Sequence, residues 1–403
     1  MDPAVTSPGI DPSALAADLA ELVQIPSVTG QERAALAWLE RRARELGLEA
    51  ELVEHDLAAL RAHPDHPGEE APRSELLTLA VTLPGTLPGR LCVCGHVDVV
   101  AAGHERWRHG PWSGAIADAC VHGRGSVDMK GGVIAALHAL AALRAAGTPA
   151  PEVVLQCVPS EEDGGLGAFA ALERDCRFDG CLIPEPTGFA VVCAQAGALT
   201  FRGTVHGRGA HAAMRLEGRS AIDRYVAVHA ALAAHERRIN ADVEHPAMRV
   251  LGLPYPVSVG RVEAGEWSSS VPDRLVFEGR LGVRVGEEPA AARAAFEAAV
   301  QEADGEDPRV EIAWTGGAFA PGETDPAHPW VARVREAVRA ERGGDAPIAG
   351  VPWGADMRLY AARGIPTVMV GTSGIELAHA VDERVRIGEV AAVARIIAGV
   401  VAA

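Results

Sequence analysis

Leu91-Cys92-Val93-Cys94-Gly95-His96-Val97-Asp98 is the stretch of this sequence that decides the fold. A near-continuous apolar run is typical of a strand in a sheet that is buried on both faces. Residues 76–82, 152–158 and 179–183 have the same character, and residues 130–146 form a helical pattern rich in Ala and Leu. Alternation of such strands and helices predicts an α/β fold with a mostly parallel sheet.

The N-terminal part is expected to add two helices and one strand to this sheet. Residues 11–24 have helical spacing, and Thr29-Gly30-Gln31-Glu32 matches a capping box that opens a second helix ending near Arg44. A short strand centred on 51–53 precedes a polar, Pro-rich loop at 57–75.

The pattern changes at about residue 194. Strands and helices of a small α+β insert are predicted at 198–205, 218–238, 256–263, 275–284 and 289–303. Helices at 331–342 and 387–402 then resume the first pattern. We therefore expect a discontinuous first domain, 1–194 and 314–403, interrupted by an inserted domain at 195–313.

Length, charge and cysteine content narrow the class of protein. A chain of 403 residues exceeds what one core usually holds, which favours two domains. The net charge of −17 argues against nucleic acid or an anionic membrane as a partner. No apolar run predicts a membrane span. Seven cysteines without a C-x-x-C pair, and no signal peptide pattern in residues 1–10, favour reduced thiols and a cytoplasmic location.

Histidines and carboxylates follow the deciding strand at widening intervals. They are His96, Asp98, Asp128, Glu161, Glu162, Glu185 and His379. Two imidazoles and several carboxylates suit two divalent cations, typically zinc. One aspartate between two histidine–carboxylate sets would bridge metals about 3.5–4 Å apart, and the pair would activate one water. The sequence therefore predicts a two-metal hydrolase.

Each of these residues also has a simpler explanation. A lone histidine is often a satisfied polar residue, but a carboxylate at Asp98 can accept the other N–H of a metal-bound His96. Asp128 precedes a helix, so helix capping is its alternative role. Glu161 and Glu162 follow a buried strand, where adjacent acids repel unless a cation holds them. If one of the two binds metal, the other is free to act as general base.

With these motifs, the chain resembles the zinc-dependent family of acetylornithine deacetylases, succinyl-diaminopimelate desuccinylases, aminoacylases and related carboxypeptidases. The similarity runs from Ile25-Pro26-Ser27 to the closing helix and includes the family's five ordered ligand motifs. It implies a zinc-peptidase-like catalytic domain with an inserted lid domain through which the protein forms a homodimer.

The resemblance also implies the role of each motif residue. One zinc ion would be bound by His96, Asp128 and Glu185, and the other by Glu162, Asp128 and His379. Asp128 would be the bridge, Glu161 the base and Asp98 the partner of His96, with Co²⁺ or Mn²⁺ as possible substitutes for Zn²⁺. A cis peptide bond is implied between Asp128 and Met129.

Three further residues are candidates for substrate contacts. His211, in Gly207-Arg208-Gly209-Ala210-His211-Ala212, resembles the lid histidine that stabilises the oxyanion, in dimeric members from the partner subunit. A plain turn residue is the alternative. Arg280 and Arg358 are candidates for binding a substrate carboxylate, and each has surface ion pairing as its alternative.

We therefore expect an amidohydrolase that removes the acyl group from an N-acyl amino acid, similar to acetylornithine deacetylase. The loop at 57–75 resembles that branch. A dipeptidase or carboxypeptidase acting on short peptides, a non-catalytic binding protein on the same fold, and a two-metal phosphoesterase remain alternatives. The acyl group and the side-chain preference stay open.

Overall fold

A computed structural model describes residues 9–305 and 310–403. Residues 1–8, on which part of the signal-peptide argument rests, lie outside the described residues. The chain divides into two compact units. Unit 1 comprises Met1–Cys193, Glu323–Ala349 and Ala355–Ala403, and unit 2 comprises Ala194–Gly322 and Gly350–Gly354.

Unit 1 is built on a mixed sheet of nine strands in the order β1-β2-β6-β3-β7-β17-β8-β15, with β16 paired to β8. The strands are β1 (Glu49–Glu54), β2 (Leu77–Leu83), β3 (Arg90–His96), β6 (Glu152–Val158), β7 (Gly180–Ile183), β8 (Val191–Gln195), β15 (Gly322–Glu323), β16 (Ile348–Val351) and β17 (Thr367–Met369). The central strands β6, β3, β7 and β17 are parallel to one another, as predicted. β1 and β2 continue the sheet antiparallel at one edge, and β8 pairs antiparallel with β17.

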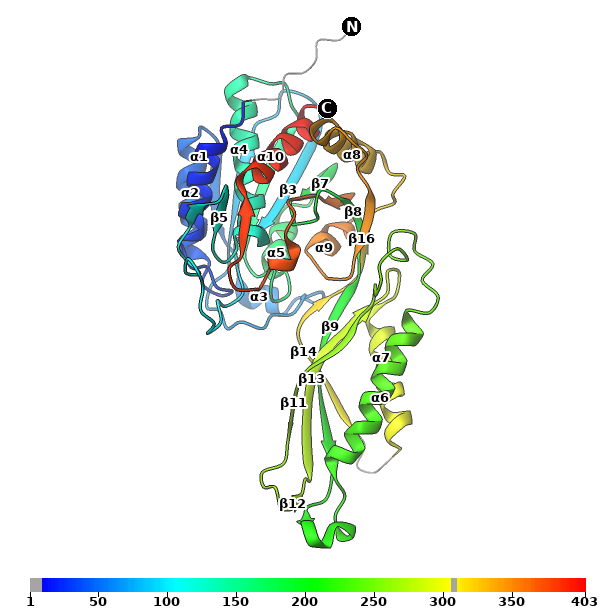
Figure 1. The fold of residues 1–403 in the computed structure, drawn as a ribbon. Helices are drawn as coiled ribbons and strands as arrows, with labels where there is room; N and C mark the ends of the chain where they lie inside the picture. The colour runs from blue at the N-terminus through cyan, green and yellow to red at the C-terminus, as the bar shows by residue number, and fades with distance from the viewer. Residues whose placement is uncertain (1–8, 306–309) are drawn as a thin grey trace. The chain divides into compact units, whose positions relative to one another are not determined.

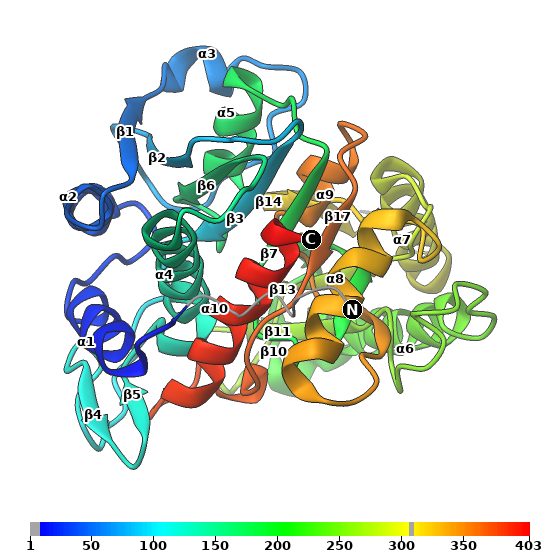
Figure 2. The ribbon, with the colours of Figure 1, turned by 90° about the horizontal axis from the view of Figure 1, so that it is seen from above.

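Helices cover both faces of this sheet. They are α1 (Pro12–Val23), α2 (Arg33–Glu45), α3 (Leu57–Arg61), α4 (Gly131–Ala146), α5 (Leu166–Arg174), α8 (Pro329–Arg342), α9 (Met357–Ala361) and α10 (Ile387–Ala402). Figures 1 and 2 show α4 packed beside α10, whereas α5 lies on the opposite face of the sheet near α9. A smaller sheet in the order β18-β5-β4 joins Arg384–Arg386, Cys120–His122 and Ala115–Ala117.

The predicted start of the second helix is wrong in one detail. The capping box at Thr29 and Glu32 does not form: the Thr29 hydroxyl donates to Asp98 Oδ2 at 3.1 Å, and Glu32 Oε1 accepts the Gly30 N–H at 2.6 Å. α2 therefore begins at Arg33 without a side-chain cap. Thr29 instead contacts Asp98, which lies 69 positions further along the chain, just beyond the end of β3.

The helix α4 of unit 1, together with the turn before it, is more apolar than predicted. Residues Ser126–Ala146 are long and apolar enough to cross a membrane by length and composition alone, and most of this stretch is buried inside the protein. The prediction that no stretch is long and apolar enough is therefore wrong. Burial of α4 between the sheet and α10 accounts for the composition.

In its described residues, unit 2 has an antiparallel sheet of four strands, two α-helices and a short strand pair, β10 (Ala210–His211) with β12 (Ser270–Val271). Its main elements are β9 (Gly197–His206), α6 (Ala221–Ile239), β11 (Val257–Ala264), β13 (Arg274–Val283), α7 (Pro289–Asp304) and β14 (Glu311–Phe319). The sheet order is β11-β13-β9-β14. The predicted boundary at residue 313 would cut β14, whose residues pair with β9 from Glu311 to Phe319. The compact unit consequently extends to Gly322.

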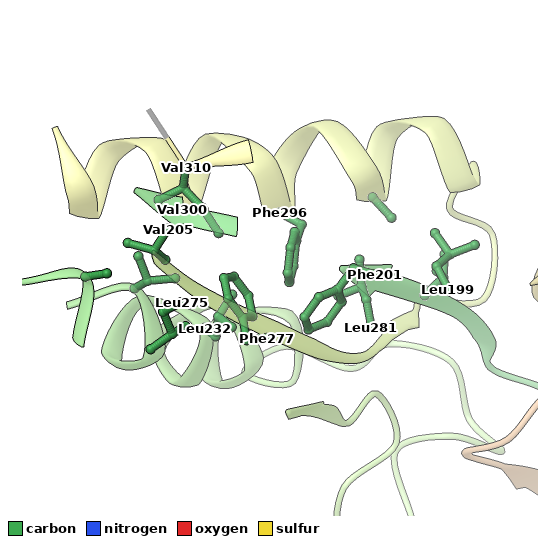
Figure 3. Close-up of a cluster of buried hydrophobic side chains, with 14 residues drawn as sticks. Leu199, Phe201, Val205, Leu232, Leu275, Phe277, Leu281, Phe296, Val300 and Val310 are labelled. Atoms are coloured by element: carbon green, nitrogen blue, oxygen red, sulfur yellow. The ribbon is translucent and has the colours of Figure 1, made fainter. Parts of the chain in front are cut away.

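Aromatic side chains, scarce in the whole sequence, gather in the core of unit 2 (Figure 3). Phe296 projects from α7, and its ring centroid lies 4.6 Å from that of Phe201 on β9. Phe277 on β13 lies 6.0 Å from Phe201 in an edge-to-face arrangement. Phe296 thus fastens α7 to the sheet.

We expect Phe296→Ala to lower the free energy of unfolding of unit 2 by about 3–5 kcal/mol, because it leaves a large cavity in this core. Urea-induced unfolding measures the loss, with Phe296→Leu as the matched variant that fills most of the volume. A loss below about 1 kcal/mol for the alanine variant would show that the core closes around the gap.

Candidate metal centre

The order of the central strands brings the predicted ligands to one edge of the sheet. His96 is the last residue of β3, and Glu162 and Glu185 follow β6 and β7, the two parallel neighbours of β3. The carboxyl ends of parallel strands meet at the same edge. Asp128 lies in the turn η1 (Ser126–Lys130) before α4, and His379 lies between η3 (Ile375–Leu377) and β18. The Asp128–Met129 peptide bond is cis.

Asp128 lies between the two histidines. Its Oδ1 is 3.1 Å from His96 Nε2, and its Oδ2 is 3.5 Å from His379 Nε2. Each carboxylate oxygen therefore faces a different imidazole, which is the arrangement that a bridging ligand needs.

Besides Asp128, each of the two histidines has a glutamate next to it. Glu185 Oε1 lies 3.8 Å from His96 Nε2, and Glu162 Oε2 lies 3.1 Å from His379 Nε2. Ligand atoms of His96, Asp128 and Glu162 all lie within 4.8 Å of one another. The five predicted ligands thus form two nitrogen and oxygen donor sets that share Asp128. Such sets fit two divalent cations of the Zn²⁺, Co²⁺ or Mn²⁺ type.

Asp98 contacts His96 through two groups. The backbone oxygen of Asp98 lies 2.9 Å from His96 Nδ1, and Asp98 Oδ1 lies 3.5 Å from the same nitrogen. The Asp98 carboxylate also accepts the N–H groups of Glu161 at 3.1 Å and Glu162 at 3.2 Å. One residue therefore orients both a candidate ligand and the loop that carries the two acids.

Comparison with known proteins identifies the family of this chain. The model of peptidase family M20/M25/M40 matches residues 92–403. The chain belongs to this family. A succinyl-diaminopimelate desuccinylase from Alkalilimnicola ehrlichii is 30% identical over 325 residues, covering 77% of this chain and 82% of the relative. The desuccinylase from Methylorubrum populi is 36% identical over 205 residues, 48% of this chain. The match thus spans about half the length of that relative, 49%.

Solved structures share the fold of this M20 chain. The aminopeptidase PepT from Bacillus cereus aligns over 98% of both chains with a TM-score of 0.73 at 21% identity. A metallo-carboxypeptidase of the M20 family from Sulfolobus solfataricus aligns over 96% of this chain and 98% of its own with a TM-score of 0.74 at 16% identity. A Bacillus subtilis protein described as a dinuclear metal-binding M20 peptidase aligns over 97% of both chains at 16% identity, with a TM-score of 0.62. The M20 chain therefore shares the fold of these proteins over nearly its whole length.

The charges at this site in the M20 chain depend strongly on one another. Burial raises the pKa of Glu161 and of Glu185 well above the ordinary value, and neighbouring carboxylates add to the effect. Burial opposes the charged form of His96, but Asp128, Asp98 and Glu185 raise its pKa well above the ordinary value. Hydrogen bonds to Asp128 and Glu162 raise the pKa of His379 to about 10. Without metal, the neighbouring carboxylates therefore favour the charged form of both histidines.

We expect metal binding to the M20 chain to release protons at pH 7. Imidazole binds metal only when neutral, so at least about one proton must leave with each histidine that becomes a ligand. The raised pKa of His379 contributes stability to the metal-free fold that is fully present below pH 6.5 and is lost as pH rises through about 10. Metal affinity should therefore rise with pH.

Calorimetry of Zn²⁺ binding in buffers with different ionisation enthalpies measures the released protons. His379→Gln is the matched variant and should release fewer. An observed enthalpy that does not depend on the buffer would contradict the prediction.

Two buried residues that the sequence analysis missed connect Asp128 to His379. Glu383 Oε1 accepts the N–H groups of Val127 at 3.0 Å and Asp128 at 3.3 Å, and Glu383 Oε2 accepts from Arg124 Nη1 at 2.8 Å. Arg124 Nη2 donates to the backbone oxygen of His379 at 3.1 Å. The only sequence signal was the proximity of both residues to ligand motifs.

Arg358 is not placed to bind a substrate. Its side chain is only 2% exposed, and it donates from Nη1 to Ala355 O at 2.8 Å and from Nη2 to Gly164 O at 2.6 Å. The prediction of a carboxylate contact is therefore not supported, because the guanidinium holds backbone carbonyls inside unit 1.

The other two predicted substrate residues belong to unit 2. His211 is exposed, and its Nδ1 accepts the Ala213 N–H at 3.1 Å at the start of η2 (Ala212–Glu217). Arg280 is exposed on β13, 5.7 Å over the ring of Phe319. The five predicted metal ligands belong to unit 1, so the roles of His211 and Arg280 stay predictions.

Proposed function

We propose that this M20 chain removes an acyl group from an N-acyl amino acid, with two divalent metal ions as cofactors. One observation carries the proposal: the two Asp128 oxygens face two separate histidine–glutamate sets, and Glu161 is buried next to them. Relatives named succinyl-diaminopimelate desuccinylases support an N-acylated amino acid as the substrate class. Zn²⁺ is the proposed native metal.

The chain's own residues then have defined tasks. Two metal ions held by His96, Asp128, Glu162, Glu185 and His379 would supply an acidified water and polarise the amide carbonyl. Glu161 accepts a proton from the attacking water and donates it to the leaving amine. Its raised pKa, caused first by burial, suits a group that must hold this proton between the two steps. His211 is proposed to donate to the carbonyl oxygen as negative charge develops there.

Substrate screening of the purified protein, reloaded with Zn²⁺, Co²⁺ or Mn²⁺, tests this function. The panel contains N-succinyl and N-acetyl amino acids, among them N-succinyl-diaminopimelate and N-acetylornithine, beside dipeptides with free carboxyl termini. Metal-dependent cleavage of an N-acyl amino acid is the expected result. Preferred cleavage of dipeptides would instead establish the peptidase alternative, and failure to bind metal would refute both.

We also propose that unit 2 forms the contact of a homodimer. Ile222 and Val226 on α6 are 44% and 64% exposed, and Val262 on the edge strand β11 is 46% exposed. Exposed apolar side chains on one helix and an unpaired sheet edge are typical of a contact surface. Sedimentation of the wild type and of Val226→Glu tests the dimer. A monomeric wild type would refute it.

We also propose that the protein is located in the cytoplasm. All seven cysteines lie in the described residues and are free thiols, six of them buried. Free thiols are the norm where glutathione and thioredoxin keep cysteines reduced. Fractionation of cells that express the tagged chain would test the location, and recovery outside the cytoplasm would refute it.

A further inference from the structure

A third acid follows the pair Glu161-Glu162 and has a different environment. The carboxylate of Asp163 is buried and accepts the N–H groups of Glu70 at 3.0 Å and Ala71 at 2.8 Å. Both of its oxygens lie 3.0 Å from Arg73 Nη2, and the Ser160 hydroxyl donates to its Oδ1. These donors occupy the carboxylate, so Asp163 serves as an acceptor in the fold and not as a metal ligand.

Arg73 is the charge at the centre of this cluster. Its side chain is 1% exposed, and three carboxylates surround it: Asp163 at 3.0 Å, Glu69 at 3.4 Å and Glu32 at 3.6 Å. Removing one partner of a buried ion pair leaves the other charge uncompensated, which is strongly unfavourable. The guanidinium is thus required for the carboxylates to stay in place.

The segment that carries Arg73 is the Pro-rich connection between α3 and β2. This segment holds Asp163 not only through the Arg73 side chain but also through the backbone N–H groups of Glu70 and Ala71. Earlier in the segment, the ring of His63 packs edge-on against Phe169 of α5 at 5.2 Å. The segment therefore contacts the loop of residues 160–165, which we call the acidic loop, and the helix that follows it.

One residue of the acidic loop has a backbone conformation that its side chain disfavours. Ser160 has a φ of 69°, whereas the φ values of Gly164 and Gly165, 144° and 78°, are ones that glycine adopts readily. A non-glycine residue in the left-handed region persists only where the surroundings fix it. Asp98 holds the N–H groups of Glu161 and Glu162 from one side, and Arg358 holds Gly164 O from another. Arg73 and its segment hold the remaining acid, Asp163.

We propose that Arg73 is a positioning residue for the metal centre, acting through Asp163 to fix the acidic loop that presents Glu161 and Glu162. The inference rests on the proposed function, because Glu161 is the base and Glu162 a ligand only there. Arg73 acts through its neighbours, because its guanidinium lies beside Glu32, Glu69 and Asp163 and a cation is no metal ligand. Catalytic groups must keep their geometry to about 0.5 Å, so a loosened acidic loop slows the reaction more than it weakens substrate binding.

The test compares Arg73→Met, Arg73→Lys and Asp163→Asn with the wild type. Arg174→Met is the matched control, because Arg174 forms an ion pair with Glu51 in the same unit and its side chain is 45% exposed. We expect Arg73→Met to lower kcat by about 10–100-fold, as loss of groups that orient metal ligands does, with KM changed less than about threefold. Arg73→Lys should recover part of kcat, and the control should match the wild type.

Amide hydrogen exchange of the full-length protein supplies a readout besides activity. Faster exchange in Arg73→Met, confined to residues 160–165 and the Arg73 segment, is expected. Should Arg73→Met fail to fold, Arg73→Lys and Asp163→Asn carry the comparison. Unchanged exchange of the acidic loop, or a kcat within twofold of the wild type, would overturn the proposal. A wild type that cleaves no amide would refute the proposed function, while exchange would still show whether Arg73 fixes the acidic loop.

Discussion

Glu161→Gln is expected to lower kcat by about 10²–10⁴-fold while the protein still binds two metal ions, because the amide cannot accept a proton. Gln has nearly the same shape as Glu, and the carboxylates that face the two histidines, at 3.8 Å and 3.1 Å, belong to Glu185 and Glu162. The main chain of Glu161 would stay in place, because Asp98 holds its N–H group. The loss should therefore be confined to proton transfer.

Kinetics and metal content must be measured on the same preparations. Glu45→Gln, on the exposed side of α2, is a matched control that makes the same chemical change away from the site. Glu162→Gln is a second comparison, and it should lose metal because Glu162 faces His379 at 3.1 Å. If Glu161→Gln retains activity within about tenfold, another group performs the proton transfer and the assignment of the base is wrong.

The sequence was sufficient for the elements whose pattern is local. Apolar runs identified β3, β6 and β7, and a residue of the metal centre lies at or just beyond the carboxyl end of each strand. Because these strands are parallel neighbours, this position of His96, Glu162 and Glu185 was enough to predict that they meet. Periodicity likewise located the longer helices of both units to within a few residues, but the short helices α3, α5 and α9 were not predicted, and α3 lies in the stretch predicted to be a loop at 57–75.

Residues that act through distant partners could not be predicted in the same way. Arg73 and Asp163 are 90 positions apart, and Arg358 and Gly164 are 194 apart, so no local pattern joins them. Arg358 shows the error that follows: an arginine near a family motif was expected to bind substrate, yet it is buried on backbone carbonyls. Burial, not residue type, decided its role.

Short antiparallel strands were missed for a related reason. β4, β5 and β18 have three residues each, too few to show an alternating pattern. Their sheet exists because Arg384 and Arg386 on β18 pair with the main chain of β5. Glu383, the residue before β18, then reaches the turn at Asp128. This part of the metal centre is thus a consequence of tertiary pairing.

Asp128→Ala is expected to remove both metal ions, whereas Glu185→Ala should affect mainly one of them. Asp128 is the residue whose oxygens face both histidines, at 3.1 Å and 3.5 Å, so its loss opens both donor sets at once. Glu185 lies near His96 only, at 3.8 Å. We expect metal affinity to fall by more than about 100-fold at both sites in Asp128→Ala, exceeding the effect of losing a group that merely orients a ligand.

Equilibrium dialysis against Zn²⁺, followed by elemental analysis, measures the bound equivalents in each variant. Asp128→Asn is an intermediate variant. Its single carbonyl oxygen can bind only one of the two metal ions, and its amide nitrogen cannot bind a cation. It should therefore keep about one equivalent, a loss between those of the other two variants. Retention of two tightly bound ions by Asp128→Ala would show that the metals do not share this aspartate, and the two-metal arrangement would have to be rebuilt from separate sites.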